Sequence, residues 1–217
     1  MATVHSLPGL RTAAKLPAGA VDLLEIRVDA FTEQKALLLE TLPRLKFPLI
    51  VTVRHPSEGG ACAMSPSKRI ELLETFLPHA ALIDVELRSL AALDSVIRRA
   101  RAEDVGLIVS HHSFQTTPPR ARLHELALRA VKARADILKV AAFTATPRQL
   151  GRLLEFAATE RRIPLSVMGM GPLGKVSRLL FSQTGSVLNY GFLDIAQVSG
   201  QWSAAQLKER IAELAGG

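Results

Sequence analysis

A regular alternation of short apolar runs with longer amphipathic segments constrains this sequence most. The runs are rich in β-branched residues and have the length of strands. They cover residues 3–6, 21–27, 48–54, 81–86, 106–112, 137–141, 164–168 and 186–192. Strands that alternate with helices are typical of βαβ units, so the sequence predicts a parallel sheet covered by helices.

Several segments between these runs begin with residues that favour the first turn of a helix. The predicted starts are Thr32-Glu33 before residues 36–42, Ser65-Pro66 before 70–77, Thr117-Pro118-Pro119 before 123–131, Thr146-Pro147 before 150–157, and Ser203 before 204–214. No Gly-x-Gly-x-x-Gly turn follows the first strand, which argues against a doubly wound nucleotide-binding sheet. Eight strands therefore predict a closed (β/α)8 TIM barrel.

The length leaves little room for anything beyond that barrel. The chain has 217 residues, and complete barrels of this kind need roughly 200. We expect a single catalytic domain over residues 1–217, of minimal size and with a short amino terminus, because strand one begins almost at Met1.

Composition excludes several classes of protein. Cys62 is the only cysteine, so an internal disulfide is excluded and a reducing cytoplasm is expected. No apolar run approaches the ~18 residues of a membrane span, and no leader segment is expected. The 27 Lys and Arg against 20 Asp and Glu suggest an anionic partner. The basic residues are scattered, however, and one Tyr and one Trp offer few stacking surfaces, which favours a solvated surface over nucleic-acid binding.

Charged residues recur at the ends of the predicted strands. Side chains of equal parity in a strand share a face, and barrels of this kind carry their active sites at the carboxyl ends of the strands. The pairs of equal parity are Glu25 with Arg27, Thr52 with Arg54, Asp84 with Glu86, and Ser110 with His112, and Lys139 lies late in strand six. One such residue would be an ordinary solvated strand end. Such residues at the ends of five consecutive strands instead predict a pocket for a small polyhydroxylated anion. Its predicted lining residues are Glu25, Arg27, Arg54, Glu86, His112 and Lys139.

Lys139 and the adjacent histidines His111 and His112 suggest a nucleophilic amine and an acid–base group. An amine flanked by apolar residues and near arginines is expected to favour its neutral form, which attacks ketones; the alternative is a lysine that extends to solvent. His111 and His112 both close strand five, and either imidazole could act as base and then acid. Parity places His112 at the mouth and His111 between strand and helix.

Two loops add candidate groups. Residues 57–60 carry Glu58 beside Gly59 and Gly60, so a flexible turn could bring a carboxylate to an imidazole. The glycine-rich residues 167–174 follow strand seven, where many barrels bind phosphate. Arg178, which follows that loop, could instead pair with a carboxylate through two hydrogen bonds.

The ordered set of motifs resembles the type I 3-dehydroquinate dehydratases over residues 21–201. The motifs are Glu25-Ile26-Arg27-Val28-Asp29, Thr52-Val53-Arg54, Glu58-Gly59-Gly60, Asp84-Val85-Glu86, Ser110-His111-His112 with Phe114 and Thr117-Pro118, Asp136-Ile137-Leu138-Lys139, Ser177-Arg178 and Gly200-Gln201.

The resemblance implies a cytoplasmic lyase of the shikimate pathway. Lys139 would form an imine with 3-dehydroquinate, and His112 would remove a proton and return it to the departing hydroxyl, giving 3-dehydroshikimate by syn elimination. Glu58 would steady the imidazole. The implied substrate-binding residues are Glu25, Arg27, Arg54, Arg178, Gln201, Met168, Met170 and Ser6. No cofactor or metal is expected, the partner is the small substrate rather than nucleic acid or a membrane, and the family suggests a homodimer.

Three departures from the family pattern leave alternatives open. Ser113 follows the catalytic histidine where the family usually has Asp, Gln197 stands at a usual serine position with Ser199 nearby, and the family's amino-terminal hairpin is not seen. One alternative is another Schiff-base barrel, such as an aldolase that binds a sugar or sugar phosphate through residues 169–174. A second is a catalytically silent barrel used for binding.

Overall fold

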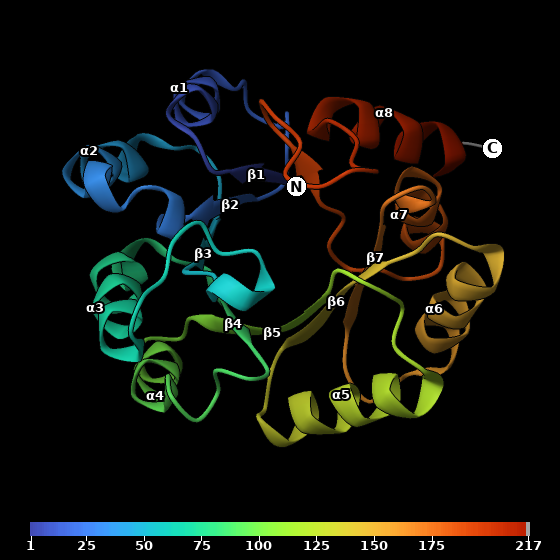
Figure 1. Ribbon diagram of the computed structural model, residues 1–217. Helices are drawn as coiled ribbons and strands as arrows, with labels where there is room; N and C mark the ends of the chain where they lie inside the picture. Colours follow the sequence, from blue (N-terminus) through green and yellow to red (C-terminus); the bar gives the residue numbers. More distant parts are fainter. Residues whose placement is uncertain (216–217) are drawn as a thin grey trace.

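Strands and helices alternate along the whole computed structural model, which describes residues 1–215 and forms a (β/α)8 barrel (Figure 1). The strands are β1 Ala2–Val4, β2 Leu24–Arg27, β3 Leu49–Thr52, β4 Leu82–Glu86, β5 Gly106–Ser113, β6 Ile137–Phe143, β7 Leu165–Met170 and β8 Gly191–Phe192. All paired strands are parallel, in the order β7-β6-β5-β4-β3-β2-β1-β8.

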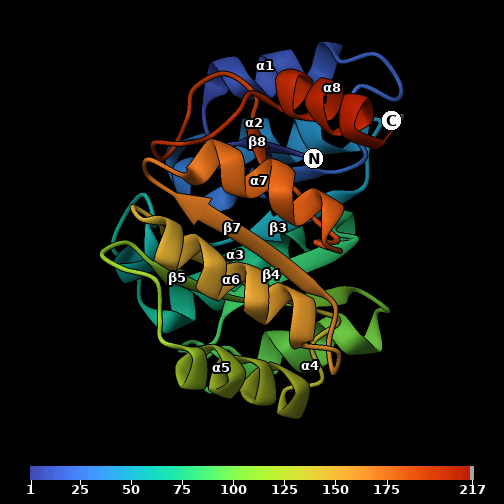
Figure 2. The same ribbon diagram turned by 90° about the vertical axis from the view of Figure 1, so that its right-hand side faces the viewer.

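The helices form an outer ring around the strands. They are α1 Leu7–Lys15, α2 Lys35–Thr41, α3 Pro66–Phe76, α4 Asp94–Ala102, α5 Arg120–Lys132, α6 Pro147–Thr159, α7 Gly174–Gln183 and α8 Ala204–Ala215. Figure 2 shows α5 to α8 stacked in chain order along one side of the barrel. Within residues 1–215 no helix has the length and apolar character that crossing a membrane requires.

The predicted helix starts coincide with real caps where a side chain bonds the first turn. Ser65 caps α3 and accepts a hydrogen bond from the Lys68 amide. Thr146 caps α6 with Gln149 in a reciprocal capping box, which satisfies two free backbone donors. As predicted, both helices have a proline in the first turn, where its ring fixes φ near the helical value.

Strand parity divides the apolar core into two parts. One part fills the barrel interior and contains Ile50, Ile108, Ala141, Met168, Met170, Leu188 and Tyr190. The other lies between strands and helices and takes residues of the opposite parity, such as Val51, Val109 and Val140. Inward-facing residues near the carboxyl ends of the strands therefore share one small space.

The seam between β7 and β8 is the least regular part of the sheet. The sequence predicts a strand over residues 186–192, but only Gly191–Phe192 pair with β1. The Val187 amide bonds the Leu165 carbonyl at 2.9 Å, and serine hydroxyls bond other backbone groups across the seam: Ser166 donates to the Leu188 carbonyl at 2.8 Å, and Ser186 accepts from the Val167 amide at 3.2 Å. The expected long strand eight is thus wrong, because serine side chains satisfy part of the backbone that a continuous strand would pair.

The first strand is also shorter than residues 3–6. It ends at Val4 because Ser6 caps α1, where its hydroxyl accepts a hydrogen bond from the Gly9 amide at 2.9 Å. The same hydroxyl donates to Asp194. Ser6 is therefore engaged at the outer rim, between β1 and the segment after β8.

Gly191 allows β8 to lie against α8, and this contact generates a stability prediction. A Cβ atom at Gly191 would lie 2.6 Å from the Cα atom of Ala204 and 2.7 Å from its amide nitrogen. We expect Gly191→Ala to destabilise the protein by about 1–3 kcal/mol, since backbone must shift. Urea unfolding measures this. The matched control is Gly151→Ala in α6, where the Cβ meets nothing within 4 Å, so that variant should gain about 0.5–1 kcal/mol; equal effects would contradict the close packing.

Candidate active site

A cavity of about 160 Å³ opens at the carboxyl ends of the strands. Residues from most strands and from the loops that follow them meet there. The lining residues are Thr3, Glu25, Arg27, Arg54, Glu58, Gly59, His112, Phe114, Lys139, Ala141, Met168, Met170, Arg178, Tyr190, Gln197, Val198 and Gln201. The cavity therefore combines one amine, one imidazole, carboxylates and guanidinium groups with an apolar wall.

Lys139 lies buried in this cavity, with 4% of the residue exposed. Its Nζ atom is 3.2 Å from Oε1 of Glu25 and 3.0 Å from Oδ2 of Asp84. Thr3 and Thr52 bond the two oxygens of Glu25 at 2.9 and 3.1 Å. The sequence predicts an amine near arginines, but its nearest charged partners are these two carboxylates.

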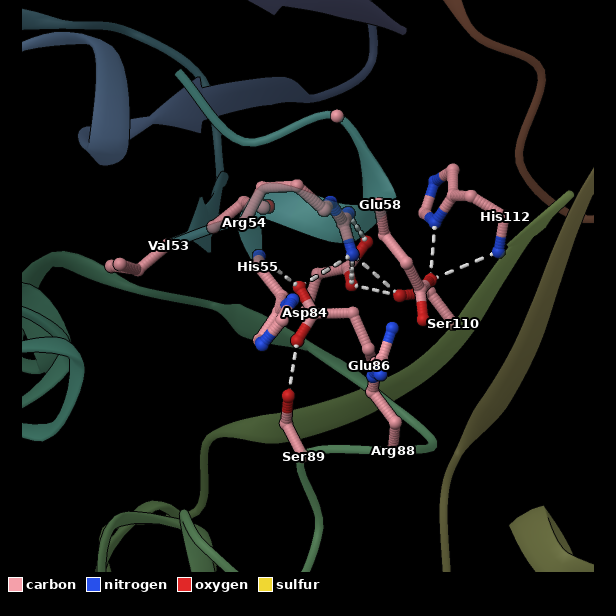
Figure 3. Close-up of polar contacts among 12 residues, drawn as sticks. Val53, Arg54, His55, Glu58, Asp84, Glu86, Arg88, Ser89, Ser110 and His112 are labelled. Carbon is pink, nitrogen blue, oxygen red and sulfur yellow. Dashed lines mark hydrogen bonds and ion pairs between the residues drawn. The ribbon is translucent and has the colours of Figure 1, made fainter. Parts of the chain in front are cut away.

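Arg54 ties the carboxylates of β4 together (Figure 3). Its Nη1 and Nη2 atoms bond Asp84 at 2.9 and 2.7 Å, and Nη1 also bonds Glu86 at 3.1 Å and Ser110 at 2.6 Å. Arg69 holds the other oxygen of Glu86 at 2.6 Å. Burial acts to raise the pKa of Asp84, but Arg54 and Lys139 hold it well below the usual value. Asp84 is therefore a carboxylate shared by a guanidinium and an amine.

His112 is positioned by Glu58, as Figure 3 shows. Oε2 of Glu58 lies 3.0 Å from Nδ1 of His112 and accepts the His112 backbone N–H at 2.9 Å. When Glu58 is ionised, this oxygen can only accept, so the ring proton lies on Nδ1 and Nε2 is the free base. Burial, with the positive charges of Arg54 and Lys139, lowers the pKa of His112 well below its usual value. The resting imidazole is neutral.

The turn that carries Glu58 is anchored from β2. Arg27 makes two hydrogen bonds to Asp29, at 3.0 and 2.7 Å, and a third to the Gly59 carbonyl at 2.8 Å. Asp29 also accepts the Ala61 amide at 2.9 Å. Gly59 has φ +86°, a conformation that favours glycine. Arg27 therefore acts on the imidazole through the backbone that bears Glu58.

Arg178 differs from the other buried cations. Within residues 1–215, each of Arg27, Arg54, Arg69 and Lys139 has a carboxylate within 4.0 Å, and Arg178 has none. Its Nε atom makes one long bond, 3.4 Å, to the Gly200 carbonyl, and Nη1 has no hydrogen-bond partner in the part of the chain that the structure describes. Burial alone lowers the pKa of Arg178 to about 10. A buried, incompletely bonded guanidinium on a cavity wall is suited to an anionic ligand.

Comparisons with known proteins agree with this geometry. The family model described as type I 3-dehydroquinase matches residues 5–215. The chain belongs to the type I 3-dehydroquinase family. It is 34% identical over 206 residues to the 3-dehydroquinate dehydratase of Thermococcus gammatolerans, covering 94% of this chain and 92% of that one. It is 32% identical over 215 residues to that of Methanocella arvoryzae, covering 99% and 95%.

Solved structures of type I 3-dehydroquinases have the same fold. The 3-dehydroquinate dehydratase of Geobacillus kaustophilus superposes with a TM-score of 0.87 at 27% identity, covering 99% of this chain and 90% of that one. The type I enzyme of Clostridium difficile, solved with covalently modified comenic acid, gives 0.86 at 27% identity, covering 96% and 87%.

Most of the residues that the sequence assigns to the site of this dehydroquinase line the cavity, and two do not. The lining group is Lys139, His112, Glu58, Glu25, Arg27, Arg54, Arg178, Gln201, Met168 and Met170. Ser6 is not among the residues that line this cavity, and its hydroxyl caps α1 and bonds Asp194. Glu86 is a correction to the predicted pocket lining, because Arg54, Arg69 and the His55 amide surround its buried carboxylate. His111 does not line the cavity and lies near arginines of α5.

Three residues that contact Lys139 or its partner Glu25 were not assigned to the site from the sequence. Asp84 shares its strand face with Glu86, and parity alone does not say which of the two reaches the amine. Thr3 is a lone polar residue in a short apolar run. Tyr190 is the only tyrosine and lies in the irregular segment before β8. Parity carries the signal for Asp84 and Thr3, whereas the sequence gives no strand register for Tyr190.

Polar groups of two loops at the mouth of the cavity already have hydrogen-bond partners within the protein. The amides of Gly169, Gly171 and Gly174 donate to the Ser177 hydroxyl and to the Ser199 and Gly171 carbonyls, respectively. These three donors are therefore already occupied, which removes the argument for a phosphate-binding loop. The Ser113 hydroxyl donates to the Thr116 carbonyl at 2.6 Å, so it braces its own loop.

Glu58 predicts a pH dependence of stability. Burial raises the pKa of Glu58 from 4.5 to about 7. Between these pH values the folded protein therefore binds more protons than the unfolded chain. The contribution of Glu58 to the free energy of unfolding falls as the pH rises from about 4.5 to about 7. The rise from 4.5 to about 7, at about 1.4 kcal/mol per pKa unit, corresponds to about 3–4 kcal/mol. Glu58→Gln should remove this part of the decline, measured as the difference in unfolding free energy between the two proteins from pH 4.5 to pH 7.5. Parallel curves would contradict the raised pKa.

Proposed function

We propose that this chain dehydrates 3-dehydroquinate to 3-dehydroshikimate, as a hydro-lyase of the shikimate pathway that leads to aromatic amino acids. One observation carries the proposal: Lys139, the His112–Glu58 pair and the unpaired Arg178 line one cavity. That set offers an amine for a ketone, a base for an adjacent proton and a cation for a carboxylate. The family membership of the whole chain supports the same reaction.

Lys139 supplies the covalent step in this proposal. Its amine must lose a proton to attack the ketone, and its nearest proton acceptors are Glu25 and Asp84. Loss of water from the resulting carbinolamine gives a protonated imine. The positive imine nitrogen accepts electron density from the adjacent carbon, which makes a proton on that carbon removable.

His112 transfers the proton. Nε2 of the neutral ring takes it from the carbon next to the imine, while Glu58 holds the ring through Nδ1. The imidazolium then gives the proton to the departing hydroxyl, so the ring returns to its starting form. Hydrolysis of the product imine by water releases 3-dehydroshikimate and restores Lys139.

The remaining lining residues bind and orient the substrate. Arg178 pairs with its carboxylate, and Met168 and Met170 provide the apolar wall. Glu25, Arg54 and Gln201 offer acceptors and donors to ring hydroxyls. Gln201 already accepts the Gln197 amide through its Oε1 at 2.7 Å, so its amide NH₂ is the group available to a ligand. Arg27 contributes chiefly by holding the Glu58 turn.

We also propose that the chain forms one catalytic domain and works in the cytoplasm as a homodimer, without a cofactor or metal. The single cysteine and the biosynthetic substrate support the location, and the family supports the dimer. A mass near twice 23.5 kDa in light scattering would agree with the dimer.

The function itself is tested by the absorbance of the conjugated ketone formed from 3-dehydroquinate. We expect steady turnover by the protein as isolated, unchanged by a chelating agent, and no measurable turnover by Lys139→Met. The surface variant Lys175→Met is the matched control and should keep full activity. Absence of turnover in the unaltered protein would favour a silent barrel.

Arg178 is predicted to determine affinity for the substrate carboxylate. Arg178→Ala should raise KM and lower kcat/KM, with a loss on the order of 2–4 kcal/mol of transition-state stabilisation, because a buried charged hydrogen-bonded pair is removed. Arg178→Lys should restore only part of this, since an ammonium cannot form the two parallel bonds. Steady-state kinetics of both variants give the answer, and unchanged constants in Arg178→Ala would move the carboxylate site to Arg54.

The two adjacent histidines are predicted to have different roles, His112 in catalysis and His111 in the stability of the fold. His112→Ala should lose roughly 10²- to 10⁴-fold in kcat, the range of general acid–base groups. His111→Ala should keep near-normal kcat and show a lower melting temperature, because His111 does not line the cavity. Kinetics and thermal unfolding of the two variants are compared directly. Equal loss of kcat would mean that the assignment of strand faces is wrong.

A further inference from the structure

Tyr190 lies on the cavity wall beside the reactive amine, and the reaction as described gives it no task. It is the only tyrosine of the chain, is 3% exposed, and immediately precedes β8. The Gly191 amide next to it donates to the Met1 carbonyl at 3.1 Å, which fixes the backbone against the first strand. The ring therefore has a defined place in the barrel interior, among the apolar side chains of the inner core.

The contact with Lys139 is made by the face of the ring. The Nζ atom lies 3.9 Å from the ring centroid, within the range at which an aromatic face attracts a cation. The tyrosine hydroxyl is buried and has no hydrogen-bond partner within residues 1–215. The aromatic face, rather than the hydroxyl, is thus the part of Tyr190 that meets the reacting nitrogen.

We propose that Tyr190 is a further catalytic residue, whose aromatic face stabilises the positive charge of the protonated imine at the Lys139 nitrogen. This inference rests on the proposed function, because it concerns the imine formed at Lys139.

The geometry gives the ring a role that the carboxylates cannot fill. A primary ammonium has three N–H groups and can bond Glu25 and Asp84 together, as seen here. A protonated imine keeps only one N–H, so at least one of those two bonds is lost when substrate is attached. Attraction to an aromatic face depends on charge and distance and needs no N–H. Tyr190 therefore continues to favour the cationic nitrogen when its hydrogen bonds decrease.

The surroundings strengthen this contact. Burial, together with the charges of Glu25 and Asp84, raises the pKa of Tyr190 well above its usual value, so the ring stays a neutral phenol. A desolvated cation gains more from an aromatic face than an exposed one does. The protonated imine, not the neutral one, is the electron sink of the elimination, so the contact raises the fraction of bound substrate that can lose its proton.

A graded replacement of the ring tests the proposal. Because Tyr190 is the only tyrosine, growth on fluorinated tyrosines alters this ring alone. Each added fluorine draws electron density from the ring face with little change in shape. We expect kcat for 3-dehydroquinate to fall stepwise from tyrosine to 3-fluorotyrosine to 3,5-difluorotyrosine, by roughly tenfold in total, with melting temperatures within a few degrees. Tyr190→Phe grown in the same media has no tyrosine, and its kcat should not respond to the fluorinated amino acid.

A second comparison separates the face from the hydroxyl. Tyr190→Leu, which removes the aromatic face, should lose at least fivefold more kcat than Tyr190→Phe, which keeps it. A flat fluorine series, or equal losses in the two variants, would overturn the proposal while turnover by the unaltered protein still supports the dehydratase. Absence of turnover in the unaltered protein would instead contradict the proposed function on which it rests.

Discussion

The balance of buried charge around Asp84 is the constraint on which the rest of the site depends. A carboxylate fully inside a barrel is costly unless cations and donors surround it. Asp84 meets this need with Arg54 on one side and Lys139 on the other, and Glu86 and Arg69 extend the same network outwards. Because neighbouring side chains match each of these charges, Lys139 is held in one place before substrate arrives. Removing one partner would leave another charge buried and unpaired, so the charged residues of this network depend on one another.

Rigid and adjustable parts of the site are divided between strands and loops. Lys139 and Asp84 project from β6 and β4, whose backbones are paired on both sides. Glu58, by contrast, lies on the short 3-10 helix Pro56–Glu58, and Arg27 holds that turn through a backbone carbonyl. In the proposed mechanism the covalent bond therefore forms at a fixed point, whereas the acid–base pair depends on a loop anchored from a neighbouring strand. Arg178 near the start of α7 remains free to meet an anion, because no carboxylate of the described residues satisfies it.

The alternation of strands and helices, and the parity of charged strand ends, could be predicted from the sequence because both follow from local geometry. That reasoning brings Lys139, His112 and Arg54 to one mouth. It fails where contacts between distant residues decide: whether Asp84 or Glu86 reaches the amine depends on the height of each strand in the barrel. Ser6 lies outside the cavity lining, because its hydroxyl caps a helix and bonds Asp194. The prediction of a long strand eight is wrong because serine side chains take over part of the backbone bonding at the seam. The position of Tyr190 could not be predicted for the same reason.

The account depends most on a covalent bond between Lys139 and the substrate. The direct measurement is reduction with borohydride during turnover of 3-dehydroquinate, followed by digestion and mass spectrometry of the peptides. The account predicts irreversible loss of activity and one reduced adduct, on the peptide that contains Lys139. An adduct on Lys175, or continued turnover with no adduct on any lysine, would contradict it.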